Sequence, residues 1–137
     1  MNLFLEIITP ENIVYKDKVD EIIVPTVNGQ ITILPNHIGL LTQTAHGELV
    51  VKKGDVKQII AITNGFLEVA NNKVCILANY AIKAENINMA EAEEAKKRAE
   101  KLMLGKATDK DFRIAEAQLR KAILELKVGL KHKRRTI

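Results

Sequence analysis

Short apolar runs rich in Ile, Val and Leu recur through residues 1–84, separated by Pro, Gly and Asn residues. Gly54-Asp55 and Asn71-Asn72 mark two of the tight turns between them. Strands that recur about every 8–12 residues with turn signals between them are typical of an all-β sandwich or barrel. We therefore expect a mainly β N-terminal sandwich. Its strands are expected at residues 3–8, 12–17, 19–24, 31–34, 47–52, 56–63, 66–69 and 74–78.

The segment at residues 29–37, which contains the expected strand at residues 31–34, is the most informative part of this half. It follows Asn28-Gly29, a pair that is typical of a type I′ hairpin turn because both residue types tolerate a positive φ. It stops at Pro35, which cannot donate a hydrogen bond to a continuing strand ladder. Asn36 and His37 then form a polar corner. No Ser, Cys or carboxylate stands at a catalytic spacing from His37, so the segment predicts a rigid hairpin that presents a polar corner.

The period of the apolar positions changes to that of a helix near Glu85. A first amphipathic helix is expected to end at Gly105, and Thr108 is expected to cap a second one, because Asp109 and Asp111 follow it in the first turn. The predicted apolar stripes are Ala92, Ala95, Ala99 and Leu102, and Phe112, Ala115, Leu119, Ala122 and Leu126. A short connection between two helices predicts an antiparallel helical hairpin at residues 85–137.

The first stripe is mostly alanine, so it buries little apolar area. Burying a Leu-sized side chain contributes only about 1.5–3 kcal/mol, and alanine contributes less. Short isolated helices are also marginal in water. We therefore expect a hairpin whose helices hold each other weakly and can separate.

The net charge of +4 at pH 7 is unevenly distributed along the chain. Residues 1–84 carry a net charge of −1 and residues 85–137 carry +5, including all five arginines. The predicted sandwich therefore lacks a basic surface, and aromatic residues are only 4% of the chain, which argues against nucleic-acid binding. The basic C-terminal end is open to two interpretations, a solvated helix terminus or an arm that binds an acidic surface.

Signatures of enzymes and metal sites are missing from the sequence. No glycine-rich phosphate loop is present, and His37, His46 and His132 show no metal-ligand spacing. The single cysteine, Cys75, lies between apolar residues and is expected to be a buried structural thiol. No apolar run approaches the roughly 18 residues of a membrane span, and no signal peptide is evident. Any membrane association is therefore expected to run through a partner.

Several motifs in order and spacing resemble the epsilon subunit of F-type ATP synthases, the small rotor subunit of the central stalk. The matching segments are Gly29–His37 with Leu40-Leu41, Gly47-Glu48-Leu49, Asn64–Val69 and Val74–Ala78. The chain departs from the family pattern at three places. Members of the family often have Ala-Pro in place of Ile38-Gly39, Glu in place of Gln30, and Gly-Gly in place of Asn64-Gly65.

The resemblance implies a non-catalytic subunit without a cofactor or metal. It would link the gamma subunit to the c-ring through a sandwich at residues 1–84 and regulate through the helices at residues 85–137. Gln30, His37 and Leu41 are expected at the partner-facing end. The implied location is the cytoplasmic face of the bacterial inner membrane, peripheral, or an organelle-encoded equivalent. The alternative is a free-standing regulatory adaptor that binds an acidic protein through the basic hairpin.

Some members of the family bind ATP through Ile-Asp-x-x-Arg-Ala at the start of the first helix, with an upstream Glu and further basic residues. Here the corresponding positions are Ile87, Asn88, Glu91 and Ala92, with Ile82 in place of the upstream Glu. The basic residues Arg98 and Arg120-Lys121 are retained. A negative charge at Glu91 would repel phosphate, so we expect weak or absent ATP binding.

In bacterial relatives the helical hairpin can extend along the rotor shaft and jam ATP hydrolysis. Basic side chains there contact acidic segments of the catalytic head, which is built from alpha and beta subunits. The resemblance assigns such contacts here to Lys121, Lys127, Lys131, Lys133, Arg134 and Arg135. We therefore expect the C-terminal half to act as a conditional brake, which means that it inhibits ATP hydrolysis when the hairpin is extended.

Overall fold

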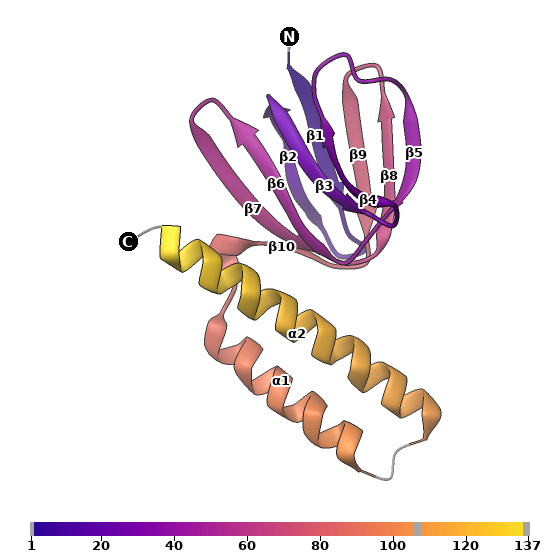
Figure 1. The fold of residues 1–137 in the computed structure, drawn as a ribbon, viewed down its shortest axis with the longest axis vertical. Coiled ribbons are helices and arrows are strands. Elements are labelled where there is room, and N and C mark those ends of the chain that lie inside the picture. Colours follow the sequence, from indigo (N-terminus) through magenta and orange to yellow (C-terminus); the bar gives the residue numbers. More distant parts are fainter. Residues whose placement is uncertain (1, 106–107, 136–137) are drawn as a thin grey trace. The chain divides into compact units, whose positions relative to one another are not determined.

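The computed structural model describes residues 2–105 and 108–135, with the side chains of residues 134 and 135 outside that description. The chain divides into two compact units, Met1–Lys83 and Ala84–Ile137. The first unit holds the strands and the second holds two long helices (Figure 1). The predicted fold class, a β-sandwich followed by an antiparallel two-helix hairpin, is confirmed.

The elements agree with the sequence pattern at most positions, and two strands were not predicted. The strands are β1 (Leu3–Ile8), β2 (Ile13–Val19), β3 (Glu21–Thr26), β4 (Gly29–Ile33), β5 (Leu40–Thr44), β6 (Gly47–Lys53), β7 (Val56–Ile62), β8 (Gly65–Ala70), β9 (Lys73–Ala78) and β10 (Ala81–Lys83). The helices are the short 3₁₀ turn η1 (Ala84–Asn86), α1 (Met89–Leu104) and α2 (Asp109–Arg135). The sequence pattern missed β5 and β10. β5 ends in three polar residues, and β10 is only three residues long.

The strands form one continuous sheet in the order β10-β7-β6-β3-β5-β8-β9-β1-β2, with β4 paired to β3. A single bridge, Thr26 to Thr44, joins the half that holds β3 to the half that holds β5. Among the described strands every pairing is antiparallel except that of β1 with β9. The first strand is therefore inserted between β9 and β2 (Figure 1).

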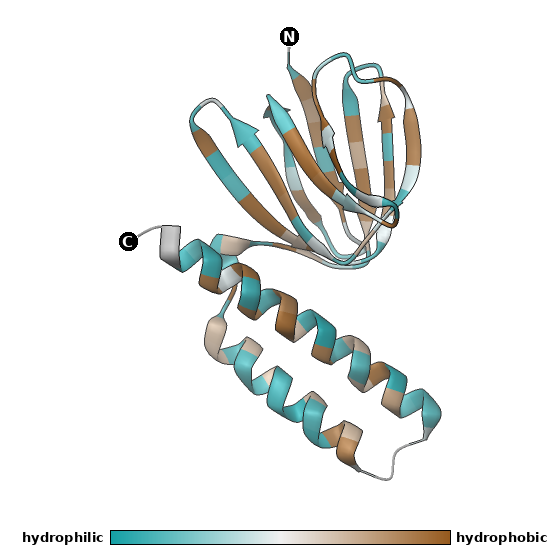
Figure 2. Cartoon of the chain, viewed as in Figure 1, coloured by the Kyte–Doolittle hydropathy of each residue, from teal (hydrophilic) through white to brown (hydrophobic). Residues whose placement is uncertain are grey.

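The two halves of the sheet enclose one core of aliphatic side chains. In β1 the buried residues Leu3, Leu5 and Ile7 alternate with more accessible neighbours, as the two-residue period of a strand requires. Figure 2 shows hydrophobic residues in brown and hydrophilic residues in teal as bands along the strands. The largest fully buried side chains are Leu3, Leu5, Ile7, Ile22, Ile33, Leu49, Ile60, Ile62, Leu67, Ile76, Val19 and Val24. Aliphatic residues therefore supply most of the core, and Tyr15 is its one aromatic member among the residues that the structure describes.

The predicted type I′ turn at Asn28-Gly29 is wrong. Thr26 pairs with Gly29, so Val27 and Asn28 are the loop residues, and only Gly29 has a positive φ, of 110°. The Thr26 hydroxyl accepts a hydrogen bond from the Asn28 N–H (3.2 Å) and donates one to the Gly29 carbonyl (2.5 Å). This side chain stabilises the loop in another conformation. The strand expected at residues 19–24 extends through Pro25, which lies within β3 and whose carbonyl accepts from the Ala45 N–H.

The other two turn signals are confirmed and give primed turns. Asn71 and Asn72 have φ values of 50° and 62° and join β8 to β9 with no other residue between the strands. Both central residues therefore have the positive φ that a type I′ turn requires. Gly54 has a φ of 59° and is the first of two loop residues between β6 and β7, which is the arrangement of a type II′ turn.

The predicted helix ends are confirmed by their hydrogen bonds. The Asn88 side chain accepts from the Glu91 N–H (3.1 Å), which makes Asn88 the N-cap of α1, and Gly105 follows its last residue. Thr108 likewise accepts from the Asp111 N–H (3.2 Å) at the start of α2. The stripes are buried at Ala92, Ala99, Ala115 and Ala122. They are exposed at Leu102 (57%) and Phe112 (39%), so the expected apolar contact does not extend to the connection between the helices.

Candidate partner-binding surfaces

The polar corner after β4 is a tight turn set by Pro35 and Asn36. The His37 N–H donates to the Leu34 carbonyl (3.1 Å), which closes a four-residue turn. Pro35 occupies its second position and Asn36, with a φ of 67°, its third, which is the residue pattern of a type II turn. A His37 Nδ1 to Ile38 carbonyl contact of 2.7 Å then orients the imidazole ring. The ring is half-buried and shows no arrangement of a general base.

The three residues expected at the partner-facing end lie in different places on the sandwich. Gln30 is exposed beside the β3–β4 turn, whereas His37 follows the opposite end of β4. Leu41 is on β5, opposite Glu68, and is 72% exposed. The structure therefore does not gather these three side chains into one cluster.

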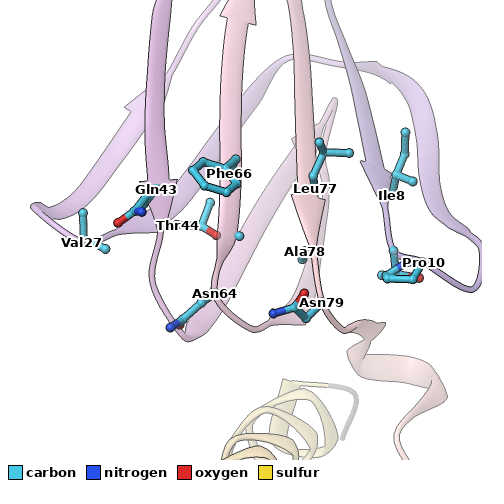
Figure 3. Close-up of a pocket in the computed structure, with 12 residues that line it drawn as sticks. Ile8, Pro10, Val27, Gln43, Thr44, Asn64, Phe66, Leu77, Ala78 and Asn79 are labelled. Atoms are coloured by element: carbon cyan, nitrogen blue, oxygen red, sulfur yellow. The ribbon is translucent and has the colours of Figure 1, made fainter.

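A groove of about 510 Å³ lies across the outer face of β5, β8, β9 and β1 (Figure 3). Its centre is one cross-strand row, because Gln43 pairs with Phe66, Phe66 with Leu77, and Leu77 with Ile8. Phe66 and Leu77 are each about half exposed, at 52% and 51%. Val27, Thr9 and Pro10 border this row. Two large apolar side chains at the centre of an open groove are typical of a protein-binding surface.

Gly65 allows the two central strands of the groove to approach closely. A Cβ atom at this position would overlap the Leu77 carbonyl oxygen and would lie 2.8 Å from the Ala78 Cα. These are backbone atoms, which cannot move aside as a flexible side chain can. The glycine therefore sets the spacing of Phe66 and Leu77 at the groove.

Cys75 lies on the same outer face, between Glu6 of β1 and Glu68 of β8. It was expected to be buried and is only half-buried, because Val74 and Ile76 take the inward positions of β9. Burial raises the pKa of the Cys75 thiol, and the carboxylates of Glu6 and Glu68 raise it further. The thiol is therefore a poor nucleophile at neutral pH, since the thiolate is the reactive form.

The residues at the positions of the ATP motif lie at the start of α1 and on both helices. Asn88 is occupied in capping α1, and Glu91 is an exposed acid in its first turn. Arg98 is exposed on α1, and the Arg120 guanidinium donates to the Glu116 carboxylate at 2.8 Å on α2. Ala92 is buried. The start of α1 thus presents the negative side chain of Glu91, which would repel a phosphate group.

The basic residues assigned to contacts with the catalytic head belong to the last part of α2. Lys127 and Lys133 are exposed, whereas Lys121 and Lys131 are half-buried. Lys127 and Lys131 are four residues apart and so lie on one side of the helix. Arg134 and Arg135 end the helix, with side chains outside the described part of the chain.

Across residues 2–105 and 108–135, no group of three or more His, Cys, Asp or Glu side chains could hold a metal ion. In the same residues no helix is both long enough and apolar enough to span a membrane. The candidate partner-binding surfaces are the outer-face groove, the polar corner and the basic end of α2.

Comparison with known families explains this combination of a groove-bearing sandwich and a helical hairpin. A family described as "ATP synthase, Delta/Epsilon chain, beta-sandwich domain" matches residues 2–84. Its companion, the "long alpha-helix domain" of the same chain, matches residues 85–129. This chain belongs to the delta/epsilon chain family of the ATP synthases. The resemblance seen in the sequence is thereby confirmed.

Bacterial relatives match over nearly their full lengths. The ATP synthase epsilon chain of Dehalococcoides mccartyi is 40% identical over 133 residues, which cover 96% of this chain and 95% of the relative. That of Chloroflexus aggregans is 39% identical over 133 residues, covering 97% and 96%. The epsilon chain of Endomicrobium trichonymphae is 33% identical over 138 residues and covers both chains fully.

Two solved structures share the fold at low sequence identity. A chain of the Euglena gracilis mitochondrial ATP synthase has a TM-score of 0.65 at 20% identity, covering 99% of this chain and 82% of its own. A chain of the Tetrahymena thermophila mitochondrial ATP synthase central stalk and c-ring has a TM-score of 0.59 at 16% identity, covering 94% and 97%. At these identities the likeness concerns the fold.

Proposed function

We propose that this chain is a non-catalytic subunit of the central stalk that links the gamma subunit to the c-ring and restrains ATP hydrolysis through its helices. The sandwich, residues 1–84, is the anchor, and residues 85–137 are the regulatory part. The subunit is held peripherally at the cytoplasmic face of the bacterial inner membrane through the gamma subunit and the c-ring. Family membership supplies the assembly, and the groove on the sandwich is the observation that carries the anchoring role.

The groove row fits the gamma subunit as its occupant, within the assembly proposed here. Phe66 and Leu77 together expose apolar area that would be buried in a permanent interface, and burying each is worth about 1.5–3 kcal/mol. Leu41, two residues from Gln43 on β5, extends the same face. Gln30 and His37 lie at opposite ends of β4 and can meet different partners, such as the gamma subunit at one end and the c-ring at the other.

The hairpin has the properties of a two-state element. Four of its buried residues, Ala92, Ala99, Ala115 and Ala122, are alanines that each bury one methyl group, worth about 0.8 kcal/mol, and Leu124 and Val128 of α2 are buried as well. Two arrangements of the helices can therefore be close in free energy, so that a partner can shift their populations. In the extended arrangement Lys127 and its basic neighbours reach acidic segments of the alpha and beta subunits and stop rotation in the direction of hydrolysis.

The test is ATP hydrolysis by the catalytic head with the gamma subunit, assembled either with the full chain or with a chain ending at Ala84. We expect the shortened chain to bind equally and to raise the rate of hydrolysis. Circular dichroism and urea unfolding check that the shortened chain folds. Equal rates for both assemblies would contradict the braking role, whereas failure of both chains to bind would contradict the anchoring role and favour a free-standing adaptor.

The basic contacts are tested by reversing one charge. Lys127→Glu is expected to weaken the inhibition of hydrolysis, because the side chain is exposed near the basic end of α2. The matched control is Lys110→Glu, also exposed but in the first turn of the same helix. An equal effect of the two variants would show that only net charge matters and would contradict a specific contact at the end of α2.

A further inference from the structure

The two helices meet along a seam of small residues at intervals of seven. α1 contributes the buried Ala92 and Ala99, and α2 contributes the buried Ala115, Ala122 and Gly129. Residues seven apart lie on the same side of a helix, and small side chains let two helix backbones approach closely. Gly129 is the last member of the seam and the only one without a methyl group.

Gly129 receives side chains from the start of α1. A Cβ atom at position 129 would overlap the Sδ of Met89, the first residue of α1, and would lie 3.3 Å from the Cγ2 of Ile87. Ile87 and Met89 flank Asn88, the N-cap of α1. The absent Cβ therefore creates a notch in α2 that the beginning of α1 fills.

We propose that the packing of Ile87 and Met89 into this notch at Gly129 holds the hairpin closed and sets the ratio of closed to open molecules. Glycine is one of the least favourable residues inside a helix. Almost any other residue at position 129 would therefore stabilise α2 considered by itself as a helix. The closed hairpin, in contrast, requires the glycine, because only there do Ile87 and Met89 occupy the space of a side chain. This inference rests on the proposed function, in which the hairpin has two states. It assigns the equilibrium between those states to the contact of Gly129 with Ile87 and Met89.

A substitution at Gly129 has two effects, a gain in the helix propensity of α2 and a clash with Met89 and Ile87, and only the clash shifts the equilibrium between the closed and open hairpin. A larger residue raises the helix propensity of α2 in both arrangements of the hairpin, so this gain does not shift the equilibrium between them. The clash with Met89 and Ile87 exists only in the closed arrangement. A substitution at Gly129 must therefore favour the open hairpin even though it improves α2 as a helix.

The test measures the distance between spin labels on the full chain. Labels are placed on cysteines at the exposed positions Glu93 of α1 and Ile123 of α2, with Cys75 replaced by serine. The unsubstituted hairpin should give a short distance. Gly129→Leu should raise the ratio of long to short distances by about tenfold, since over-packing of this kind commonly costs enough for such a factor. Gly129→Ala should give a smaller shift, because the Met89 sulfur is part of a flexible side chain that can move.

A second variant tests the contact itself. Met89→Ala with Gly129→Ala removes the sulfur that meets the new Cβ and should return the short distance that Gly129→Ala alone weakens. The matched control is Ala117→Leu, which adds a leucine to an exposed position of the same helix and should leave the distances unchanged. If Gly129→Leu keeps the unsubstituted distances, or if the double variant does not recover them, the proposal is wrong.

The same variants in the assembled enzyme separate this proposal from the proposed function. If the brake acts through the open hairpin, Gly129→Leu should lower ATP hydrolysis relative to the unsubstituted chain. A distance shift without a change in hydrolysis would support the notch and contradict the brake. A brake that is released by truncation at Ala84 but unaffected by Gly129→Leu, with unchanged distances, would contradict the notch alone.

Discussion

Asn36 and Asn72 form two hydrogen bonds that join two loops far apart in the sequence. The Asn36 N–H donates to the Asn72 Oδ1 (2.5 Å), and the Asn72 Nδ2 donates to the Asn36 Oδ1 (3.3 Å). Both residues have positive φ values, 67° and 62°. The type II turn after β4 is thereby attached to the type I′ turn between β8 and β9. The loop that carries His37 is positioned by this contact as well as by its own turn.

Replacing Asn72 separates the hydrogen bonds from the backbone conformation. Asn72→Gly keeps a residue that tolerates the positive φ and removes only the amide, so it should lower the free energy of unfolding by about 0.5–1.5 kcal/mol. Asn72→Ala adds a strained left-handed conformation and should cost about 1–2 kcal/mol more. Urea denaturation measures both. Asn71→Gly, in the same turn, is the control, and a loss as large as that of Asn72→Gly would contradict the role of the amide contact.

Gly65→Ala should destabilise the sandwich by about 3 kcal/mol or prevent folding, because the new Cβ would overlap backbone atoms of Leu77 and Ala78. Gly39→Ala is the matched control. A Cβ at Gly39 would meet only the Val69 carbonyl oxygen, at an ordinary contact distance of 3.6 Å. Urea denaturation of the two variants gives the comparison. Equal stability of both would mean that β8 and β9 can separate without cost.

The alkylation rate of Cys75 should depend on pH in a way that reports its surroundings. Because the pKa of the folded thiol is raised, the rate should still be rising at pH values where a free cysteine has reached its plateau. Glu68→Gln removes one of the charges that raise the pKa and should shift the rate curve to lower pH. Glu11→Gln, which changes an exposed carboxylate elsewhere, should leave it in place.

The same raised pKa has a consequence for stability. The contribution of the half-buried neutral thiol to the free energy of unfolding is complete below the pKa of the unfolded thiol and is lost as the pH rises through the folded pKa. The free energy of unfolding should therefore fall as the pH rises in the alkaline range, and Cys75→Ser should make this fall less steep. Tyr15 and Lys53, whose pKa values are also raised, would still contribute to it. A free energy of unfolding that rises with pH in the alkaline range would contradict a raised pKa of the Cys75 thiol.

Phe66→Glu should weaken binding to the gamma subunit by about tenfold or more, because a charge replaces an aromatic side chain at the centre of the groove. Val56→Glu is the matched control, since Val56 is also more than half exposed but lies on β7, outside the groove. Titration calorimetry of the two variants against the gamma subunit measures the difference. Equal weakening by both would contradict the groove as the binding surface.

ATP should leave the melting temperature of the chain unchanged. A ligand that binds only the folded state must raise this temperature, and the exposed carboxylate of Glu91 opposes phosphate binding at the start of α1. Differential scanning calorimetry with and without millimolar ATP is the measurement, and ADP serves as a second nucleotide. A rise with ATP would mean that the retained Arg98 and Arg120 suffice for binding.

Local chemistry determined the features that could be predicted from the sequence. Thr108 caps α2 as expected, because a cap depends on a side chain and an N–H only three residues away, and Asn88 caps α1 in the same way. The strand pattern was predictable for the same reason, since alternation is a property of neighbouring residues. The turn at Asn28-Gly29 was mispredicted because the hydroxyl of Thr26, which the turn signal ignores, stabilises another loop.

The features that bear on function depend on long-range register. Ile8, Gln43, Phe66 and Leu77 meet in one row only after four strands have paired, and no local pattern in the sequence marks them as neighbours. Gly129 is similar, because a glycine in a helical pattern indicates a weak position until Ile87 and Met89 are known to fill it. The partner surfaces could therefore be assigned from the sequence only through the family resemblance.

The parallel pairing of β1 with β9 determines when this protein can fold during synthesis. The first strand, Leu3–Ile8, leaves the ribosome early, whereas its partner, Lys73–Ala78, is made only when most of the sandwich has been translated. At typical translation rates the delay is roughly several seconds, during which a β1–β2 hairpin alone is only marginally stable. A nascent chain therefore has an apolar first strand without its β9 partner until Lys73–Ala78 has been translated. The helices are translated last, when the sandwich already has every strand that it needs.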